Sequence, residues 1–229
     1  MPSDLIQSLC QALCEVGRRA YAHGWVSHHD GNFSIRLGPD EFLVTPTGVS
    51  KGFMDPDQMV RVNLEGESLD GQGRASSEWK MHRKSYEMRP DVGAIVHTHA
   101  PHATAFAVAG LDLDRAVLPE MIATLGAVPL APYGQPGTED IYAGMVPLID
   151  KADAFLLKNH GLVTFGEDIW RAYYRHEAVE HAARIEILAR QIGKVDVLTR
   201  EQVEALKKAR DASRASGPWM NCKCEGEGS

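Results

Sequence analysis

The chain has 229 residues, 44% of them apolar and 24% charged, and its 31 acidic and 24 basic residues give a net charge of −7. This length fits one sizeable domain that buries its own core, and the acidic balance argues against nucleic acid as a partner, because phosphate backbones select basic surfaces. The N-terminal residues show no basic–apolar signal pattern, and no apolar run approaches the length of a membrane span. We therefore expect a cytoplasmic protein with neither a nucleic-acid nor a membrane partner.

The first half of the chain predicts two helices separated by short strands. Ser3 is a suitable N-cap for a helix that ends at Gly24, and Gly38-Pro39-Asp40 is typical of a hairpin turn. The expected elements are a helix over 3–24, strands over 32–37 and 41–46, a turn of helix and a strand within 55–64, an exposed loop over 66–74, and a helix over 77–88 that ends before Pro90.

The second half alternates strands and helices irregularly. The expected elements are a strand over 91–99, a helix over 101–110, a strand over 126–133, a helix over 138–150, strands over 152–159 and 161–166 around a tight loop at His160-Gly161, and helices over 168–192 and 200–213. Short hairpin connections favour a sheet that is mixed or mainly antiparallel, with helices on both faces. We therefore predict a single three-layer α/β domain over residues 1–215 and a flexible tail over 216–229.

The four cysteines are expected to play no part in chemistry. Cys10 and Cys14 are four residues apart on the first predicted helix, where both would face the core as small hydrophobes. Cys222 and Cys224 fall in the polar tail. Two thiolates alone do not complete a zinc shell, so the sequence favours a flexible end over a metal site there.

The segment "VGAIVHTHA" at residues 92–100 places two histidines inside an apolar strand. Side chains alternate along a strand, so His97 and His99 share one face, at about 6.6–7 Å between their Cα atoms. That spacing allows both imidazoles to reach one metal ion. A polar pair with ordinary hydrogen-bond partners would explain the same pattern, so the motif needs a third ligand to be decisive.

His160 is the candidate for that third ligand. It follows an apolar strand directly and precedes Gly161, which permits a sharp turn. Three neutral histidines with an open coordination position are what a catalytic zinc ion requires. The histidines on predicted helices have no comparable setting and are expected to be surface or capping residues: His23, His82, His102, His176 and His181.

Several small polar loops could bind an anion next to such a metal. Ser76, Ser77 and Glu78 stand at the start of a predicted helix, whose positive end and unpaired amides favour negative charge. "DGNFS" and "TPTGVSKG" add Gly31, Asn32, Thr47 and Gly48 as further hydrogen-bonding positions. None of these loops carries a P-loop or dinucleotide fingerprint, and each alone could be a simple turn. Together with three histidines they suggest a phosphate site beside a Lewis acid.

The ordered motifs "GNFS", "TPTG", "SSE", "HTH", "PEMIATLGAVPLAPYGQPGTED" and "KNHG" resemble the class II aldolase/adducin family, whose enzymes include fuculose-phosphate and related zinc aldolases. The resemblance covers about residues 5–195, and it is specific because all the motifs occur in order at suitable spacing. It implies a central, largely antiparallel sheet between helix layers and a C4 homotetramer with sites at subunit borders.

The resemblance also implies the roles of individual residues. A zinc ion would be held by His97, His99 and His160, and Glu78 would be the catalytic acid/base, able to approach the metal in the resting state. The substrate phosphate would lie against a set of polar loop residues: Asn32, Thr47, Gly48, Ser76 and Ser77.

Two positions depart from the family pattern. Glu120, in "LPEMI", replaces the tyrosine of the fuculose-phosphate enzyme, and methylthioribulose-phosphate dehydratases of the family use a glutamate there but lack one at the position of Glu78. Because this chain keeps both, we expect Glu120 to be a second proton donor, with a solvated carboxylate as the alternative. The second departure is "SHHDGN", where His28, His29 and Asp30 would either flank the pocket and alter substrate choice or form an exposed turn.

These features predict a zinc-dependent aldolase that cleaves a ketose 1-phosphate, of the L-fuculose or 5-deoxyribulose type, into dihydroxyacetone phosphate and an aldehyde. A dehydratase of the methylthioribulose-1-phosphate type and a sugar-acid phosphate decarboxylase are the alternatives within the family. A non-catalytic metal-binding assembly module is the alternative of another class, and the intact histidine set counts against it. Mn, Co or Fe could also occupy a three-histidine site, since ligand type discriminates poorly among these metals.

Overall fold

The computed structural model describes residues 3–71, 73–212 and 217–226. Within these ranges seven strands form one sheet, in the order β3-β2-β1-β4-β7-β6-β5. The strands are β1 (Asn32–Gly38), β2 (Glu41–Val44), β3 (Val60–Val62), β4 (Ala94–Thr98), β5 (Leu130–Ala131), β6 (Ala154–Leu157) and β7 (Gly161–Gly166). Neighbouring strands are antiparallel except for β5 and β6, which are parallel. The predicted α/β class with a mixed, largely antiparallel sheet is confirmed.

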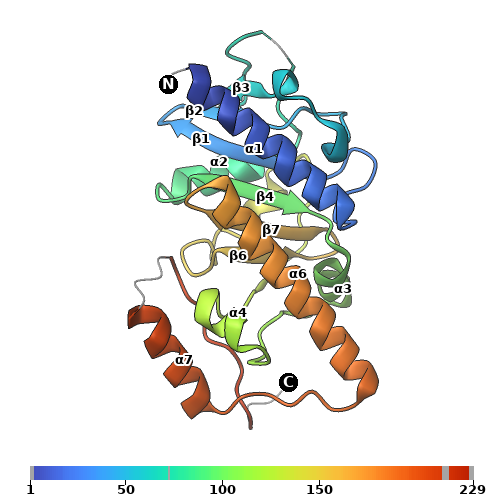
Figure 1. Ribbon diagram of the computed structural model, residues 1–229, viewed down its shortest axis with the longest axis vertical. Coiled ribbons are helices and arrows are strands. Elements are labelled where there is room, and N and C mark those ends of the chain that lie inside the picture. Colours follow the sequence, from blue (N-terminus) through green and yellow to red (C-terminus); the bar gives the residue numbers. More distant parts are fainter. Residues whose placement is uncertain (1–2, 72, 213–216, 227–229) are drawn as a thin grey trace.

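Helices cover both faces of this sheet. They are α1 (Ser3–Ala22), α2 (Trp79–Met88), α3 (Pro101–Ala109), α4 (Pro119–Thr124), α5 (Asp140–Ala143), α6 (Ile169–Ile192) and α7 (Arg200–Ala212), with two 3-10 turns, η1 (Lys51–Phe53) and η2 (Pro56–Gln58). Figure 1 shows α1 and α6 crossing one face, while α2 lies behind the sheet. None of the described helices is long and apolar enough to cross a membrane.

Alternation along the central strands separates two cores. Phe33 and Val96 point toward α1 and α6 and belong to one buried cluster. Ile95 and Val163 point to the opposite face, where they pack with residues of α2 and α5. Because His97 alternates with Val96, its side chain lies on the α2 side of the sheet.

Prolines shorten two of the expected elements. The helix expected over 138–150 is only α5, because Gly144 disfavours the helix and Pro147 cannot donate within it. Of the strand expected over 126–133, only β5 joins the sheet, since Pro129 and Pro132 flank it and lack the N–H that a ladder needs; Gly126 and Val128 make isolated bridges to Met220 and Leu113 instead. The short helix α4, which begins at Pro119, is not among the predicted elements.

The C-terminal segment also differs from expectation. Residues 217–226 pack against α4: Trp219 Nε1 donates to the carbonyl of Ile122 at 2.6 Å, and the N–H of Ala127 donates to the carbonyl of Met220 at 3.0 Å. Cys222 and Cys224 are buried in the same cluster. This packing corrects the prediction of a flexible tail for residues 217–226. The remaining positions of that predicted tail, 216 and 227–229, lie outside the described residues. The same holds for position 213 of the last predicted helix.

Candidate active site

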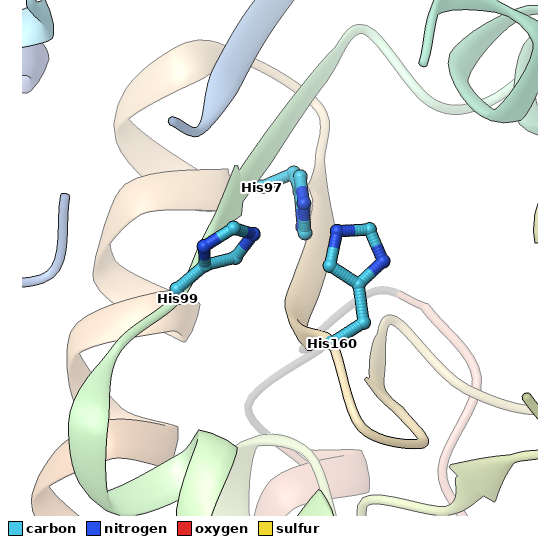
Figure 2. Close-up of side chains that lie close together, drawn as sticks. All are labelled: His97, His99 and His160. Carbon is cyan, nitrogen blue, oxygen red and sulfur yellow. The ribbon is translucent and has the colours of Figure 1, made fainter. Parts of the chain in front are cut away.

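Three histidines meet at one end of the central strands. His97 lies in β4, His99 directly follows this strand, and His160 lies in the turn between β6 and β7. The pairing of His97 with Val163 and of Thr98 with Leu162 places that turn beside the end of β4. One ligand nitrogen from each ring lies within 4.8 Å of the other two, and Figure 2 shows the three rings around a common space. The triad proposed from sequence therefore converges.

Gly161 allows the approach of the two segments. A Cβ atom at this position would lie 2.4 Å from the carbonyl oxygen of Thr98 and 2.9 Å from Cδ2 of His99, closer than carbon atoms tolerate. The left-handed residue of the turn is Asn159, with φ of 56°. Gly161 is thus required for close packing against β4, and not for the turn conformation that the sequence suggested.

The outer nitrogens of two histidines are fixed by hydrogen bonds. His97 Nδ1 donates to the carbonyl of Leu162 at 2.9 Å, and His99 Nδ1 lies 3.2 Å from Oδ2 of Asp30. Both contacts place the ring proton on Nδ1 and leave Nε2 as a bare acceptor. Among the described residues, Nε2 of His97 and of His99 are buried without a hydrogen-bond partner. Such orphaned acceptors cost free energy unless they bind something.

The nitrogen set fits a divalent transition metal. Imidazole nitrogens bind zinc at about 2.0–2.1 Å, so small ring rotations would bring all three to one ion. Burial lowers the pKa of His99 to about 4, and the nearby His97 and His160 lower it further in the same direction. A histidine that resists protonation remains available as a neutral ligand.

Glu78 lies against two of the histidines. Its Oε1 is 3.0 Å from Nε2 of His160, and its Oε2 is 3.4 Å from Nε2 of His97. Burial alone would raise the pKa of Glu78, but the neighbouring His97 and His160 outweigh it and hold this pKa well below its usual range. Glu78 is the residue just before α2, so the predicted helix begins two residues later than Ser77.

The proposed phosphate residues lie around the same end of the sheet. Asn32 pairs with His97 across β1 and β4, and its Nδ2 donates to Oε2 of Glu78 at 2.6 Å. Ser76 lines a cavity of about 10 Å³ together with Asn32. Ser34 pairs with Val44, so the end of β2 lies beside the start of β1, where Asn32 is found. Thr47 and Gly48 follow β2 at this end and are exposed. Ser77 is also exposed.

The two departures from the family pattern occupy different places. Glu120 is exposed in the first turn of α4, and no contact in the described part of the chain joins its carboxylate to the three histidines. His28 and His29 are exposed, with their ring centroids 3.8 Å apart. Asp30, by contrast, reaches His99, a contact that sequence reasoning did not predict.

Two histidines expected at the surface are buried instead. His82 in α2 is 2% exposed and His176 in α6 is 0% exposed, so their assignment as surface or capping residues was wrong. The helical period carries the missed signal, since Trp79 and Tyr86 stand three and four residues from His82 and are also buried. His176 bonds Thr98 on β4, at 2.7 Å between Nε2 and Oγ1, directly behind the candidate ligands.

The fold and the three converging histidines are those of a three-layer α/β protein that can hold a divalent metal. Comparison with known proteins identifies the family. The family model for the Class II Aldolase and Adducin N-terminal domain matches residues 11–187. The chain therefore belongs to the class II aldolase and adducin family, as the sequence resemblance predicted.

Relatives within this family carry different activities. The chain is 33% identical over 183 residues to the 3-oxo-tetronate 4-phosphate decarboxylase of Escherichia coli, covering 78% of this chain and 86% of that protein. It is 33% identical over 208 residues to the 5-deoxy-D-ribulose 1-phosphate aldolase of Bacillus thuringiensis, covering 89% and 96%. A solved L-fuculose 1-phosphate aldolase superposes with a TM-score of 0.81 at 28% identity, covering 92% of this chain and 98% of that one.

Proposed function

We propose that this chain is a zinc-dependent aldolase that cleaves a ketose 1-phosphate, of the L-fuculose or 5-deoxyribulose type, into dihydroxyacetone phosphate and an aldehyde. The observation that carries the proposal is the pair of buried Nε2 atoms of His97 and His99, which have no hydrogen-bond partner among the described residues; the Nε2 of His97 lies 3.4 Å from the carboxylate of Glu78. Relatives of this chain include proteins named for both substrate types.

His97, His99 and His160 would hold the metal, with Glu78 near enough to approach it. When bound there, a zinc ion supplies a Lewis acid that withdraws electron density from the substrate carbonyl. Other divalent transition metals share the same donor preferences.

Glu78 would move the proton in this reaction. When the carbon–carbon bond breaks, its electron pair stays with the carbon that becomes part of dihydroxyacetone phosphate, and that carbon must be protonated. Glu78, which is ionised at rest, would receive a proton as the substrate hydroxyl becomes the aldehyde carbonyl and would pass a proton to this carbon; in the reverse, condensing direction it would take one back. Asn32, Thr47, Gly48, Ser76 and Ser77 would bind the phosphate and so orient the reacting carbon.

Glu120 is proposed to act from a neighbouring subunit. Within one chain it is exposed on α4, so it could serve as a second proton donor toward the aldehyde oxygen only in an assembly with sites at subunit borders. We therefore include a C4 homotetramer in the proposal. Light scattering tests it, with an expected mass of four times the 25.1 kDa of one chain.

A sugar-acid phosphate decarboxylase is the second candidate. Relatives named 3-oxo-tetronate 4-phosphate decarboxylase match this chain at 31–33% identity, and relatives named as aldolases match it at 33%. Loss of CO2 from a 3-oxo acid also leaves an electron pair next to a carbonyl, so the same residues would serve both reactions.

Product analysis distinguishes these functions. Zinc-loaded protein is given L-fuculose 1-phosphate, 5-deoxyribulose 1-phosphate and 3-oxo-tetronate 4-phosphate in separate assays. Release of dihydroxyacetone phosphate, abolished in Glu78→Gln, supports the aldolase, whereas CO2 release from the third compound alone supports the decarboxylase. If no compound reacts and Glu78→Gln changes only stability, the protein is a metal-binding module without turnover.

A further inference from the structure

A chain of hydrogen-bonded side chains runs from the interior to Glu78. Tyr86 Oη lies 2.8 Å from Ser34 Oγ, and Ser34 Oγ lies 2.7 Å from Nδ1 of His82. His82 Nε2 lies 2.6 Å from Oδ1 of Asn32, whose Nδ2 is 2.6 Å from Oε2 of Glu78. Apart from Glu78, every member is buried.

The donor and the acceptor of each hydrogen bond in this series can be assigned by starting from Glu78. The carboxylate of Glu78 only accepts, so Asn32 turns its NH2 toward Glu78 and its Oδ1 toward His82. That oxygen needs a donor, so the proton of His82 is on Nε2. Burial lowers the pKa of His82 to about 3, so the ring is neutral and Nδ1 accepts.

The inner members complete the sequence. Ser34 gives its single proton to Nδ1 of His82, so its oxygen must accept from the hydroxyl of Tyr86. All the donors therefore point toward Glu78, and each member has one orientation compatible with its neighbours. The series therefore fixes the orientation of the Asn32 amide, which could otherwise flip at little cost.

Because its amide is fixed, Asn32 can donate two hydrogen bonds in defined directions. One N–H of its NH2 holds Glu78, and the other is left for the anion that the neighbouring loops would bind. A flipped amide would instead present Oδ1 to the carboxylate of Glu78 and to a phosphate, both of which repel it.

We propose that His82 is a positioning residue: through Ser34 and Tyr86 it is held as the Nε2–H tautomer, and it locks the Asn32 amide so that both its N–H groups face Glu78 and the substrate phosphate. This inference rests on the proposed function, which it deepens. His82 itself does not touch substrate, and its influence passes entirely through Asn32.

The test compares His82→Leu, His82→Gln, Asn32→Ala and the double variant His82→Leu/Asn32→Ala in the zinc-loaded protein. We expect His82→Leu to lower kcat and to weaken binding of inorganic phosphate, each by about 10-fold or more, as for other outer residues that orient a site. His82→Gln, whose amide can still donate to Oδ1, should recover most of both. In the Asn32→Ala background, His82→Leu should have no further effect.

Two results would overturn the proposal: additive losses in the double variant, which indicate a general packing role, or a folded His82→Leu protein with unchanged kcat and phosphate affinity. If His82→Leu does not fold, Ser34→Ala removes the donor to Nδ1 together with the acceptor for Tyr86, leaves His82 and Asn32 in place, and should still weaken phosphate binding.

A measurement without turnover separates this inference from the proposed function. Nitrogen-15 spectra of the histidine rings should show His82 neutral with its proton on Nε2, and a proton on Nδ1 contradicts the proposal. Should the wild-type protein turn over none of the sugar phosphates, the proposed function fails, while the tautomer and the affinity for inorganic phosphate still decide the role of His82.

Discussion

Asp30 shows how one side chain can prepare a candidate metal ligand. Its Oδ2 faces Nδ1 of His99 at 3.2 Å, and its Oδ1 accepts from the N–H of Ser27 at 2.5 Å. The second contact fixes the carboxylate, and the first fixes the tautomer of His99. The "SHHDGN" departure therefore contributes through Asp30, while His28 and His29 remain at the surface.

Replacing Asp30 by asparagine should weaken zinc binding. An asparagine amide can present either an oxygen or an NH2 to His99, so it no longer enforces a bare Nε2. We expect an affinity loss of about 10–100-fold, measured by competition with a chelator of known affinity. Asp168→Asn is the matched control, because Asp168 only caps α6 by accepting from the N–H of Arg171. Equal affinities for both variants would contradict the assigned role of Asp30.

At the scale of elements, the site depends on how closely the β6–β7 turn approaches β4. The antiparallel register sets the position of His160 along the strand, and Gly161 sets its distance from His97 and His99. On the other side of β4, His176 of α6 accepts from Thr98, and its Nδ1 donates to Thr164 of β7 at 3.1 Å. The two strands that carry the histidines are thus joined from behind by α6.

Gly161→Ala should damage both stability and metal binding. The added methyl would displace the turn from Thr98 and His99, and overpacking of this kind costs about 1–3 kcal/mol. Urea unfolding and zinc titration measure the two effects. Gly193→Ala, after α6, is the control, because a Cβ there meets no atom within 4 Å at an extended φ of 174°. Unchanged zinc affinity in Gly161→Ala would show that close approach is not required.

The whole molecule is closed by its C-terminal segment. Trp219 donates to the carbonyl of Ile122, lies under Lys207 of α7 with Nζ 4.6 Å from its ring centroid, and approaches Gly126. This segment joins α4 and α7 into one cluster beyond β6 (Figure 1). The position of Glu120 on α4 consequently depends on residues far along the chain.

Trp219→Ala should lower the free energy of unfolding by about 2–4 kcal/mol, since it removes a large, partly buried ring and the partner of a buried carbonyl. Trp219→Phe retains most of the ring and should lose about 1 kcal/mol. Urea denaturation measures both. Wild-type stability in Trp219→Ala would mean that the segment does not hold α4 in solution.

Global stability should fall in mild acid because of the two buried histidines. Burial lowers the pKa of His176 to about 3, and it lowers the pKa of His82 to about the same value. Between pH of about 3 and about 6.5 the unfolded chain binds protons that the folded chain does not, so the free energy of unfolding decreases as pH falls through this window. At about pH 5.5 each histidine accounts for about 1.4 kcal/mol.

The measurement is urea unfolding of wild type and His176→Gln at about pH 7.5 and about pH 5.5. Between these two pH values the free energy of unfolding should decrease less in His176→Gln than in wild type. The difference should be about half of the decrease that the two histidines cause together. His181→Gln, at an exposed position on the same helix, is the control. An identical pH dependence in all three proteins would contradict the assignment of His176 as a buried neutral group.

The sequence by itself was sufficient for the class of fold, the family and the candidate metal ligands. These depend on local patterns: the alternation that puts His97 and His99 on one face, the turn residues around His160, and motifs whose order survives divergence. Most elements were predicted for the same reason, since period and turn chemistry act within a few residues. Where prolines interrupt an apolar run, as in 126–133 and 138–150, the pattern overstated the element.

Only the tertiary structure decided what the buried polar side chains bond. The helical period next to Trp79 and Tyr86 marks His82 as buried, but it does not identify a partner. His82 and His176 are neutral core residues because β1, β4 and β7 supply Asn32, Ser34, Thr98 and Thr164 as partners. Asp30 reaches His99, and the C-terminal segment reaches α4, for an equivalent reason. A hydrogen bond between distant segments depends on their packing in space, and no local pattern records that packing.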